Sequence, residues 1–287
     1  MTHPSIFDRM NQIDRRVIYL VLAIVLMIPM FRPVGFPIYE DPLAVEFYET
    51  VAALPEGSTV LYSADFDADG LAELRPMLEV MIDLSLQKGH RIVLMTLWAA
   101  GNNLLMDWTD KIFHQREAVY GEDYINLGYI PSYAGFLEAS RTNFHAACNG
   151  GVDNERRPLT EFPIMANIHV ASDFDAVICF SIGDPGYTHW VQFWSATGEV
   201  QTILAGVVSV NYPGALNAYN AGNLRAVVAG INGAATLEKC HGIRGRAYGA
   251  SDAQSFGHLA IIAFLILGNI GYFGAKYANT RSPAQAS

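Results

Sequence analysis

Two long uncharged apolar runs lie near the ends of the chain. The first, VIYLVLAIVLMIPMF at residues 17–31, follows Arg15 and Arg16, and the second, LAIIAFLILGNIGYFGA at residues 259–275, precedes Lys276. Crossing a bilayer core of roughly 30 Å takes about 20 helical residues at about 1.5 Å each. The runs therefore predict transmembrane helices at residues 17–38 and 251–277, the first reaching into the interface through residues 36–38.

A cleaved signal peptide is the alternative for the first run, because basic residues precede an apolar core. The residues that follow, FRPVG at 31–35, contain no small-x-small cleavage site. An uncleaved anchor is therefore the favoured interpretation.

Between these runs, short apolar segments alternate with longer helical patterns. The strand candidates are near-continuously apolar: TVLYSA (59–64), RIVLMTL (91–97), YINLGYI (124–130), DAVICFSI (175–182) and VQTILAGV (200–207). Helical patterns cover residues 43–54, 71–89 and 103–120. Strands that are apolar on both faces are typical of a parallel sheet covered by helices on both sides. We therefore predict a doubly wound, mostly parallel, Rossmann-like α/β domain over residues 39–250, between tails at 1–16 and 278–287.

The last part of this domain, AGNLRAVVAGINGAATLEKC at 221–240, is rich in small residues. Gly230 and Gly233 lie three apart, which is compatible with a closely packed helix. We expect such a helix to bury itself against another backbone, either within the domain or across a subunit interface.

Composition and charge narrow the class of protein. The chain is 51% hydrophobic and only 16% charged, which is more apolar than an ordinary soluble protein. Its net charge of −10 lies mainly on the central domain and argues against binding nucleic acid or anionic lipid headgroups.

Basic residues near the two runs indicate the orientation. Five lie in the tails: Arg9, Arg15, Arg16, Lys276 and Arg281. Three lie on the other side of the runs: Arg32, Arg244 and Arg246. This difference favours tails in the cytoplasm and a central domain on the periplasmic side of a bacterial inner membrane.

The three cysteines do not form the pattern of a disulfide framework or a zinc site. Cys179 lies inside the apolar run AVICFSI, so we expect a buried thiol. A bridge between Cys148 and Cys240 is an open alternative in an oxidising compartment. The six histidines between residues 90 and 241 show no paired metal-binding spacing.

The stretch SADFDADG at 63–70 resembles the first half of a calcium loop. Counted from Asp65, Gly70 stands at position 6, but position 12 is Pro76 instead of the required glutamate. The EF-hand interpretation fails. A looser magnesium or calcium site is less favoured than the alternative, in which Asp67 or Asp69 caps the helix that starts near residue 71.

Ligands of doubly wound sheets bind at the carboxyl ends of the strands. Loops 63–69, 98–103 and 181–187 should converge there, and Ser63, Asp65, Asp67, Ser181, Gly183 and Gly186 are the candidate ligand-binding residues. In SIGDPGYTHW at 181–190, backbone N–H groups at a helix start are suited to an anion. The pattern is neither G-x-G-x-x-G nor a P-loop, and Asp184 opposes an anion.

The second apolar run carries a packing signal. Gly268, Gly271 and Gly274 recur every three residues, and Asn269 places an amide at membrane depth. Small residues allow helices to approach closely, and an amide in a membrane needs a hydrogen-bond partner. Packing of the two predicted spans within one chain and association between chains are both open.

The order of these features resembles a group of uncharacterised prokaryotic membrane proteins with two spans and a central Rossmann-like domain. The matching stretches are IDRRVIYL (13–20), SADFDADGLAELRPM (63–77), INLGYIPSY (125–133), SIGDPGYTHWVQ (181–192), GNLRAVVAGINGAATLE (222–238) and SDAQSFGHLAIIAFLILGNIGYF (251–273). The resemblance implies the architecture and contributes no activity, cofactor or catalytic residue.

Two functional classes follow. The first is a non-enzymatic subunit that makes protein–protein contacts in a membrane assembly, with itself or with a larger complex, and contacts membrane lipid. The aromatic loop residues Trp98, Tyr133, Tyr187 and Trp190 are candidates for such contacts, or for the core. The alternative is a small-ligand or anion-binding protein, or an enzyme, that uses the crevice at the strand ends. We predict no catalytic residue, metal or cofactor.

Overall fold

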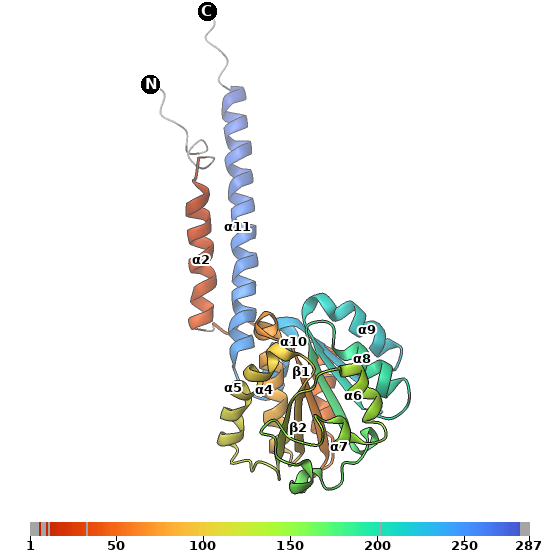
Figure 1. The fold of residues 1–287 in the computed structure, drawn as a ribbon. Helices are drawn as coiled ribbons and strands as arrows, with labels where there is room; N and C mark the ends of the chain where they lie inside the picture. Colours follow the sequence, from red (N-terminus) through yellow and green to blue (C-terminus); the bar gives the residue numbers. More distant parts are fainter. Residues whose placement is uncertain (1–5, 7–9, 11, 33, 201, 282–287) are drawn as a thin grey trace, which may run out of the picture. The chain divides into compact units, whose positions relative to one another are not determined.

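The protein is described by a computed structural model that covers residues 6, 10, 12–32, 34–200 and 202–281. Predictions that involve Arg9, Pro33, Gln201 and residues 282–287 lie outside these residues. The chain divides into two compact units, one of residues 38–247 and one that joins residues 1–37 to residues 248–287 (Figure 1). Each unit is described by itself.

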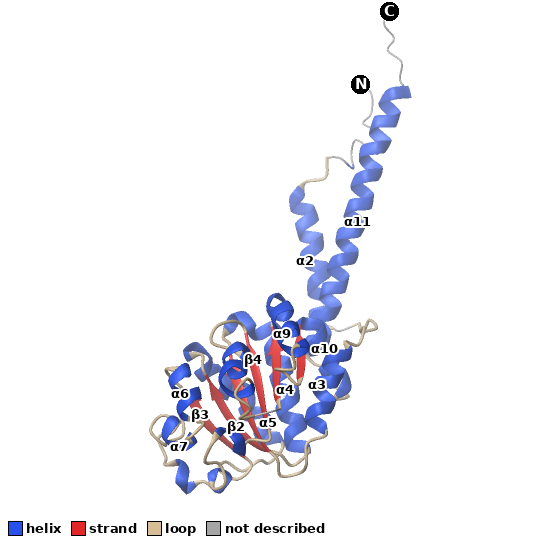
Figure 2. Cartoon of the chain, turned by 90° about the vertical axis from the view of Figure 1, so that its right-hand side faces the viewer, coloured by secondary structure: helices blue, strands red, loops and turns tan. Residues whose placement is uncertain are grey.

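The larger unit is built on a six-stranded, all-parallel sheet (Figure 2). Its strands are β1 (Thr59–Asp65), β2 (Arg91–Thr96), β3 (Tyr124–Tyr129), β4 (Ala176–Ser181), β5 (Ile203–Val207) and β6 (Ala226–Ala229), in the order β3-β2-β1-β4-β5-β6. The order reverses between β1 and β4, where Leu61 pairs with Val177. The predicted parallel α/β sheet is confirmed, and its strand order is that of a doubly wound fold.

Helices cover both faces of this sheet. One face carries α3 (Pro42–Ala52), α4 (Leu71–Gln87), α5 (Asn102–Gln115) and α10 (Gly230–Cys240), and the other α6 (Tyr133–Ala139), α7 (Phe144–Ala147), α8 (Tyr187–Trp190) and α9 (Tyr212–Asn220). Successive residues of a strand point to opposite faces, so Val60 and Tyr62 join the first core and Leu61 the second. Each such buried side chain contributes about 1.5–3 kcal/mol, which explains the apolar strand sequences.

Strand β6 corrects one prediction. Residues 226–229 were expected in a small-residue helix, but they form a strand, and α10 begins only at Gly230. Gly230 has φ +68, a conformation that favours glycine, and it makes the turn between the two elements. A Cβ on Gly233 would lie 2.7 Å from Cγ2 of Val228. The small residues therefore bring α10 close to the sheet of its own domain.

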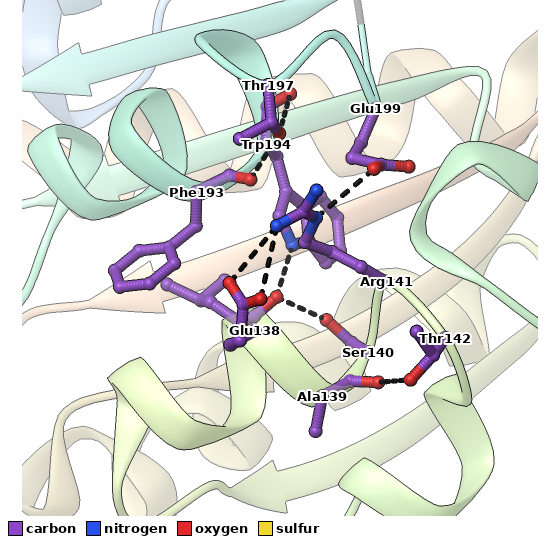
Figure 3. A network of polar contacts seen from close by, with 10 residues as sticks. Glu138, Ala139, Ser140, Arg141, Thr142, Phe193, Trp194, Thr197 and Glu199 are labelled. Atoms are coloured by element: carbon purple, nitrogen blue, oxygen red, sulfur yellow. Dashed lines mark hydrogen bonds and ion pairs between the residues drawn. The ribbon is translucent and has the colours of Figure 1, made fainter.

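A polar network holds the second helical layer together (Figure 3). Arg141 donates to Glu138 at 3.2 Å and to Glu199 at 3.1 Å, so it joins the end of α6 to the segment after β4. The buried indole of Trp194 donates to the carbonyl of Leu137 at 3.0 Å. These contacts fix residues 187–199, a short α-helix followed by a π-helical turn, against α6.

The smaller unit contains most of α11 (Arg246–Arg281) and α2 (Arg15–Phe31). Among the described helices, α11 alone is long and apolar enough to be a candidate membrane span. Helix α2 has 17 residues, or about 25 Å of rise, and does not continue to residue 38 as predicted. Arg32 ends it with φ −141, because the residue before a proline disfavours the α conformation. A full-length N-terminal span is therefore not shown.

Polar and aromatic contacts tie the chain after α2 to the first turns of α11. The buried carboxylate of Asp252 accepts from the backbone N–H groups of Gly35 at 2.8 Å and Phe36 at 3.0 Å. The ring of Phe36 lies 5.0 Å from that of Phe256. A Cβ on Gly257 would lie 3.0 Å from Cδ2 of Leu26, so this glycine permits a close approach to α2.

Candidate functional site

Asp65 ends β1 at the point where the strand order reverses. Its side chain is fully buried, and Oδ1 accepts from the Leu97 backbone N–H and from the Ser63 hydroxyl, both at 2.7 Å. Oδ2 receives longer contacts from the Cys179 thiol at 3.4 Å and the Trp190 indole N–H at 3.5 Å. Burial raises the pKa of Asp65 to about 6, although these hydrogen bonds oppose the rise. The carboxylate is therefore surrounded by donors of its own domain.

The three predicted loops do converge around this carboxylate. The Ile182 backbone N–H donates to the Asp65 carbonyl at 3.2 Å, which joins loop 181–187 to loop 63–69. Loop 98–103 is held equally closely, because a Cβ on Gly101 would lie 2.5 Å from the Phe66 carbonyl oxygen. Ser63, Asp65 and Ser181 have no exposed surface. At these three residues the predicted edge is closed by side chains of its own domain, and we call residues 63–69, 96–101 and 181–190 the closed edge. Ligand binding by Ser63, Asp65, Asp67 and Ser181 stays a prediction.

Asp67 lies at the outer side of the closed edge. Its side chain accepts from the Asp69 backbone N–H and from the Trp98 indole, both at 3.1 Å. It thereby caps a 3₁₀ turn, Ala68–Gly70, that leads into α4, whose own N-cap Gly70 has no side chain to offer. The predicted capping role is thus found one turn earlier than expected.

In the SIGDPG loop at 181–186 and the residue after it, two backbone N–H groups contact side chains of the same segment. The Tyr187 backbone N–H donates to the Ser181 hydroxyl at 3.3 Å, and the Gly186 N–H points to Nδ1 of His189 at 3.5 Å. A Cβ on Gly186 would collide with the carbonyl of Gly183. His189 faces Asp184 at 3.3 Å. The N–H groups of Gly186 and Tyr187, which were expected to face an anion, are thus used within the loop, and ligand binding by Gly183 and Gly186 stays a prediction.

Two of the three cysteines and one of the four aromatic candidate residues are buried in the core. Cys148 and Cys179 are buried, Cys240 is half-buried and all three are free, so the alternative Cys148–Cys240 bridge is absent. Burial raises the pKa of the Cys179 thiol, and the Asp65 charge raises it further.

Trp190, a candidate for contacts with partners, is fully buried and belongs to the core. Trp98, Tyr133 and Tyr187 are half-buried.

A cavity of about 410 Å³ lies at the carboxyl end of β3 and was not predicted. Its polar lining comes from the start of α5, from the end of β3 and from loop 149–156: Asn102, Tyr129, Asn149, Asp153, Asn154 and Arg156. We call it the asparagine cavity. The available sequence signal was the polar stretch NGGVDNERRP at 149–158, in which glycine and asparagine indicate turns but not what they enclose.

A second cavity of about 450 Å³ lies over α4, α5 and the end of α10. Its charges are largely paired. Arg116 binds both oxygens of Asp83 at 2.5 and 2.7 Å, and Nε2 of His241 lies 2.6 Å from the same carboxylate. These donors hold the pKa of Asp83 below its usual value, although burial opposes them. Nδ1 of His241 contacts the Tyr48 hydroxyl at 3.1 Å, so this network ties α3, α4, α5 and α10 together.

Metal binding has no preformed site in the part of the chain that the structure describes. Within it, no group of three or more His, Cys, Asp or Glu side chains is placed to hold an ion. Comparison with known proteins found no match to this chain among family models, curated proteins or solved structures. The site must therefore be judged on its own geometry.

Proposed function

We propose that this protein is a membrane-anchored, non-enzymatic subunit that builds or stabilises a membrane assembly through protein–protein contacts. Helix α11 is its principal anchor and α2 a second one, and both contact membrane lipid. The Rossmann-like domain, residues 39–250, lies on the periplasmic side of a bacterial inner membrane, with both tails in the cytoplasm. Its partners are further copies of the chain or a larger membrane protein complex.

The observation that carries this proposal is the position of Asn269 on α11. Between residues 257 and 277 of α11, the buried residues are Gly257 and Gly271, and Gly257 approaches α2. Asn269 is exposed and, at about 100° per residue, lies about 200° around the helix from Gly271. It shares its exposed face with Leu265 and Phe273. The amide therefore points away from the helix that already packs on α11.

The hydrogen bonds of Asn269 explain why a partner helix is needed there. Its Nδ2 donates to the carbonyl of Leu265 in the same helix at 2.8 Å, and Oδ1 has no partner among the described residues. In hydrocarbon, an amide oxygen without a donor is unfavourable, and interhelical amide bonds contribute about 0.6–2 kcal/mol. A second Asn269 offers both a donor and an acceptor, so two copies related by a twofold axis satisfy each other.

The four predicted packing residues of α11 differ in exposure. Gly271 is buried and Gly274 half-buried, whereas Gly268 and Asn269 are exposed. A Cβ on Gly268 would meet nothing within 4 Å. The proposal assigns Gly271 and Gly274 to packing within the chain and Asn269 to contact with a neighbouring chain. Gly268 lies about 60° from Gly271 and about 100° from Asn269 around the helix, between the two faces.

Disulfide cross-linking in native membranes tests this proposal. The background keeps the buried Cys148 and Cys179 and carries Cys240→Ser; Asn269→Cys and Leu267→Cys are added separately, because both positions are exposed and about 200° apart on α11. We expect oxidant-dependent dimers from position 269 and little from position 267. Equal cross-linking at both positions, or none at position 269 in chains shown to be inserted in the membrane, would overturn the proposed contact between copies through Asn269.

A further inference from the structure

The asparagine cavity has the chemistry of a small-ligand site, and we propose that it binds an oxyanion group, a phosphate or a carboxylate, carried by a small polar molecule. This inference does not depend on the proposed role in membrane assembly. Its volume of about 410 Å³ lies within the roughly 300–1,000 Å³ range of small-molecule sites. Its lining is mostly amide, carboxylate and guanidinium groups, which selects a polar ligand over an apolar one.

Arg156 supplies the positive charge of the cavity. Its guanidinium is exposed and makes no hydrogen bond or ion pair with the residues that the structure describes. By contrast, the neighbouring Arg157 is committed, because it binds Asp153 at 2.8 Å and Glu155 at 3.1 Å. A free guanidinium with its fork of donors is suited to bind a phosphate or carboxylate in a bidentate manner.

The one carboxylate in the lining is screened from such a ligand by its own partners. Asp153 is 2% exposed and accepts from the Tyr120 hydroxyl at 2.9 Å and from the backbone N–H groups of Glu155 and Arg157. Nε of Arg157 adds a further bond at 3.0 Å. Asp153 therefore organises the loop and its charge is balanced by Arg157, which leaves the charge of Arg156 for a ligand.

Helix α5 presents its first turn to the same cavity. It has 14 residues, and its N-cap Gly101 provides no side-chain hydrogen bond to the first N–H groups. The first residue, Asn102, lines the cavity, where the positive end of the helix dipole favours an anion. The helix start and Arg156 reach the cavity from different segments of the chain.

The Asn102 amide has hydrogen-bonding capacity that the chain does not use. Its Nδ2 makes one long contact, 3.4 Å to Oδ1 of Asn154, and its Oδ1 is buried without a partner among the described residues. A buried polar atom without a partner in the protein is rare in native proteins, so this oxygen is available to a hydrogen-bond donor of a bound molecule. A side-chain amide has an NH₂ donor and a carbonyl acceptor, and a 180° flip exchanges them. Either group can therefore bond to a hydroxyl on the molecule that carries the oxyanion.

The backbone of loop 149–156 is held in an unfavourable conformation on the cavity wall. Asn149 has φ +46, in a region that asparagine tolerates, and Arg156 has φ +64, which costs a residue such as arginine about 1–2 kcal/mol. Glycine would relieve this at position 156 but would remove the guanidinium. Nδ2 of Asn149 also donates to the carbonyls of Leu127 at 3.3 Å and Tyr129 at 3.0 Å, which fixes the loop to β3. The wall is therefore preorganised.

Calorimetric titration of the full-length chain in detergent micelles tests the assignment, with inorganic phosphate, malonate and ribose 5-phosphate as the probes in a buffer free of both oxyanions. We expect phosphate or malonate to bind, and the better of the two identifies the group. Ribose 5-phosphate should bind at least about tenfold more tightly than inorganic phosphate, because its hydroxyls reach the amides. Equal affinities would overturn the role given to the asparagines.

Arg156→Gln is the decisive variant, and Arg91→Gln is its matched control, since Arg91 is also exposed but lies at the amino end of β2, whereas the cavity lies at the carboxyl end of the neighbouring strand β3. We expect the first to weaken binding at least about tenfold and the second to leave it unchanged. Asn154→Asp, at an exposed position, should also abolish binding by placing a negative charge in the cavity. No binding of any probe, or equal losses in the two arginine variants, would overturn the proposal.

Discussion

The closed edge and the asparagine cavity occupy the same side of one sheet but use their polar residues in opposite ways. At the closed edge, Asp65 lies on a central strand where the strand order reverses, the place where doubly wound folds usually bind ligands. Yet donors of its own domain surround its carboxylate. Beside the edge strand β3, Arg156 and Asn102 keep unused hydrogen-bonding groups around an open volume.

The difference shows that position in a fold is a weaker guide to binding than the partners of the side chains. A buried polar group that is already satisfied contributes to the rigidity of the core, and a ligand has to displace its partners before it can bind. A polar group left without a partner beside a cavity is available at no such cost. In this domain, the second condition is met away from the reversal of strand order.

The largest expected effect on the free energy of unfolding comes from removing a buried side chain of the closed edge. Trp190→Ala removes a fully buried indole and should lower the free energy of unfolding by about 3–5 kcal/mol. Trp98→Ala changes a half-buried side chain shortly before α5 and should lower the free energy of unfolding clearly less. Urea denaturation of the full-length variants in micelles measures both. Similar losses would contradict the view that Trp190 fills the closed edge.

The charge of Asp65 should make stability depend on pH. Because the folded chain binds this proton more tightly, with a pKa of about 6 against an ordinary value of 3.8, its contribution is most favourable below pH 3.8 and is lost as the pH rises to 6. One pKa unit corresponds to about 1.4 kcal/mol, so the loss is about 3 kcal/mol.

Asp65→Asn removes this titration. The free energy of unfolding of the wild type, relative to the variant, should therefore fall between pH 4 and pH 6 and stay constant above that range. Parallel denaturation series at several pH values give the difference, in which other titrating groups cancel. A difference that does not change with pH would show that the carboxylate is not buried as described.

A substitution in the asparagine cavity should have a smaller effect on the free energy of unfolding, and of the opposite sign. Arg156→Gly relieves the positive φ of +64 and should leave stability unchanged or raise it by up to about 1 kcal/mol. Binding of inorganic phosphate should be lost in the same variant. Arg156→Lys is the control, because it retains the strain and the charge. If Arg156→Gly destabilised the protein, the side chain would have a structural partner that this account lacks.

The sequence predicted the regular part of the domain well because its signal is local. The stretches IVLM at 92–95 and AVICF at 176–180 are apolar at every position, as is typical of strands covered on both faces. Strand β6 was missed because its four residues, AVVA, are small and directly precede the glycines of α10. The N-terminal span was overestimated because apolar residues 36–38 were joined to a helix that ends at Phe31.

The candidate site was predicted only in part, because it depends on contacts between distant residues. Asp65, Asp67 and Ser181 do lie at the carboxyl ends of strands, as expected, but their sequence does not reveal that Leu97, Trp98 and Tyr187 would supply their hydrogen bonds. The asparagine cavity joins residues separated by about fifty positions, and left-handed backbone at Asn149 and Arg156 leaves no pattern that sequence reading detects.

Hydrogen–deuterium exchange of the full-length protein in micelles tests the contrast between the two regions most directly. The measurement compares saturating inorganic phosphate with sodium chloride of the same ionic strength. Amide exchange should slow in residues 149–157 and at the start of α5 and stay unchanged in residues 63–67 and 181–187. Slower exchange at 181–187, with none at 149–157, would place the anion at the closed edge and contradict this account.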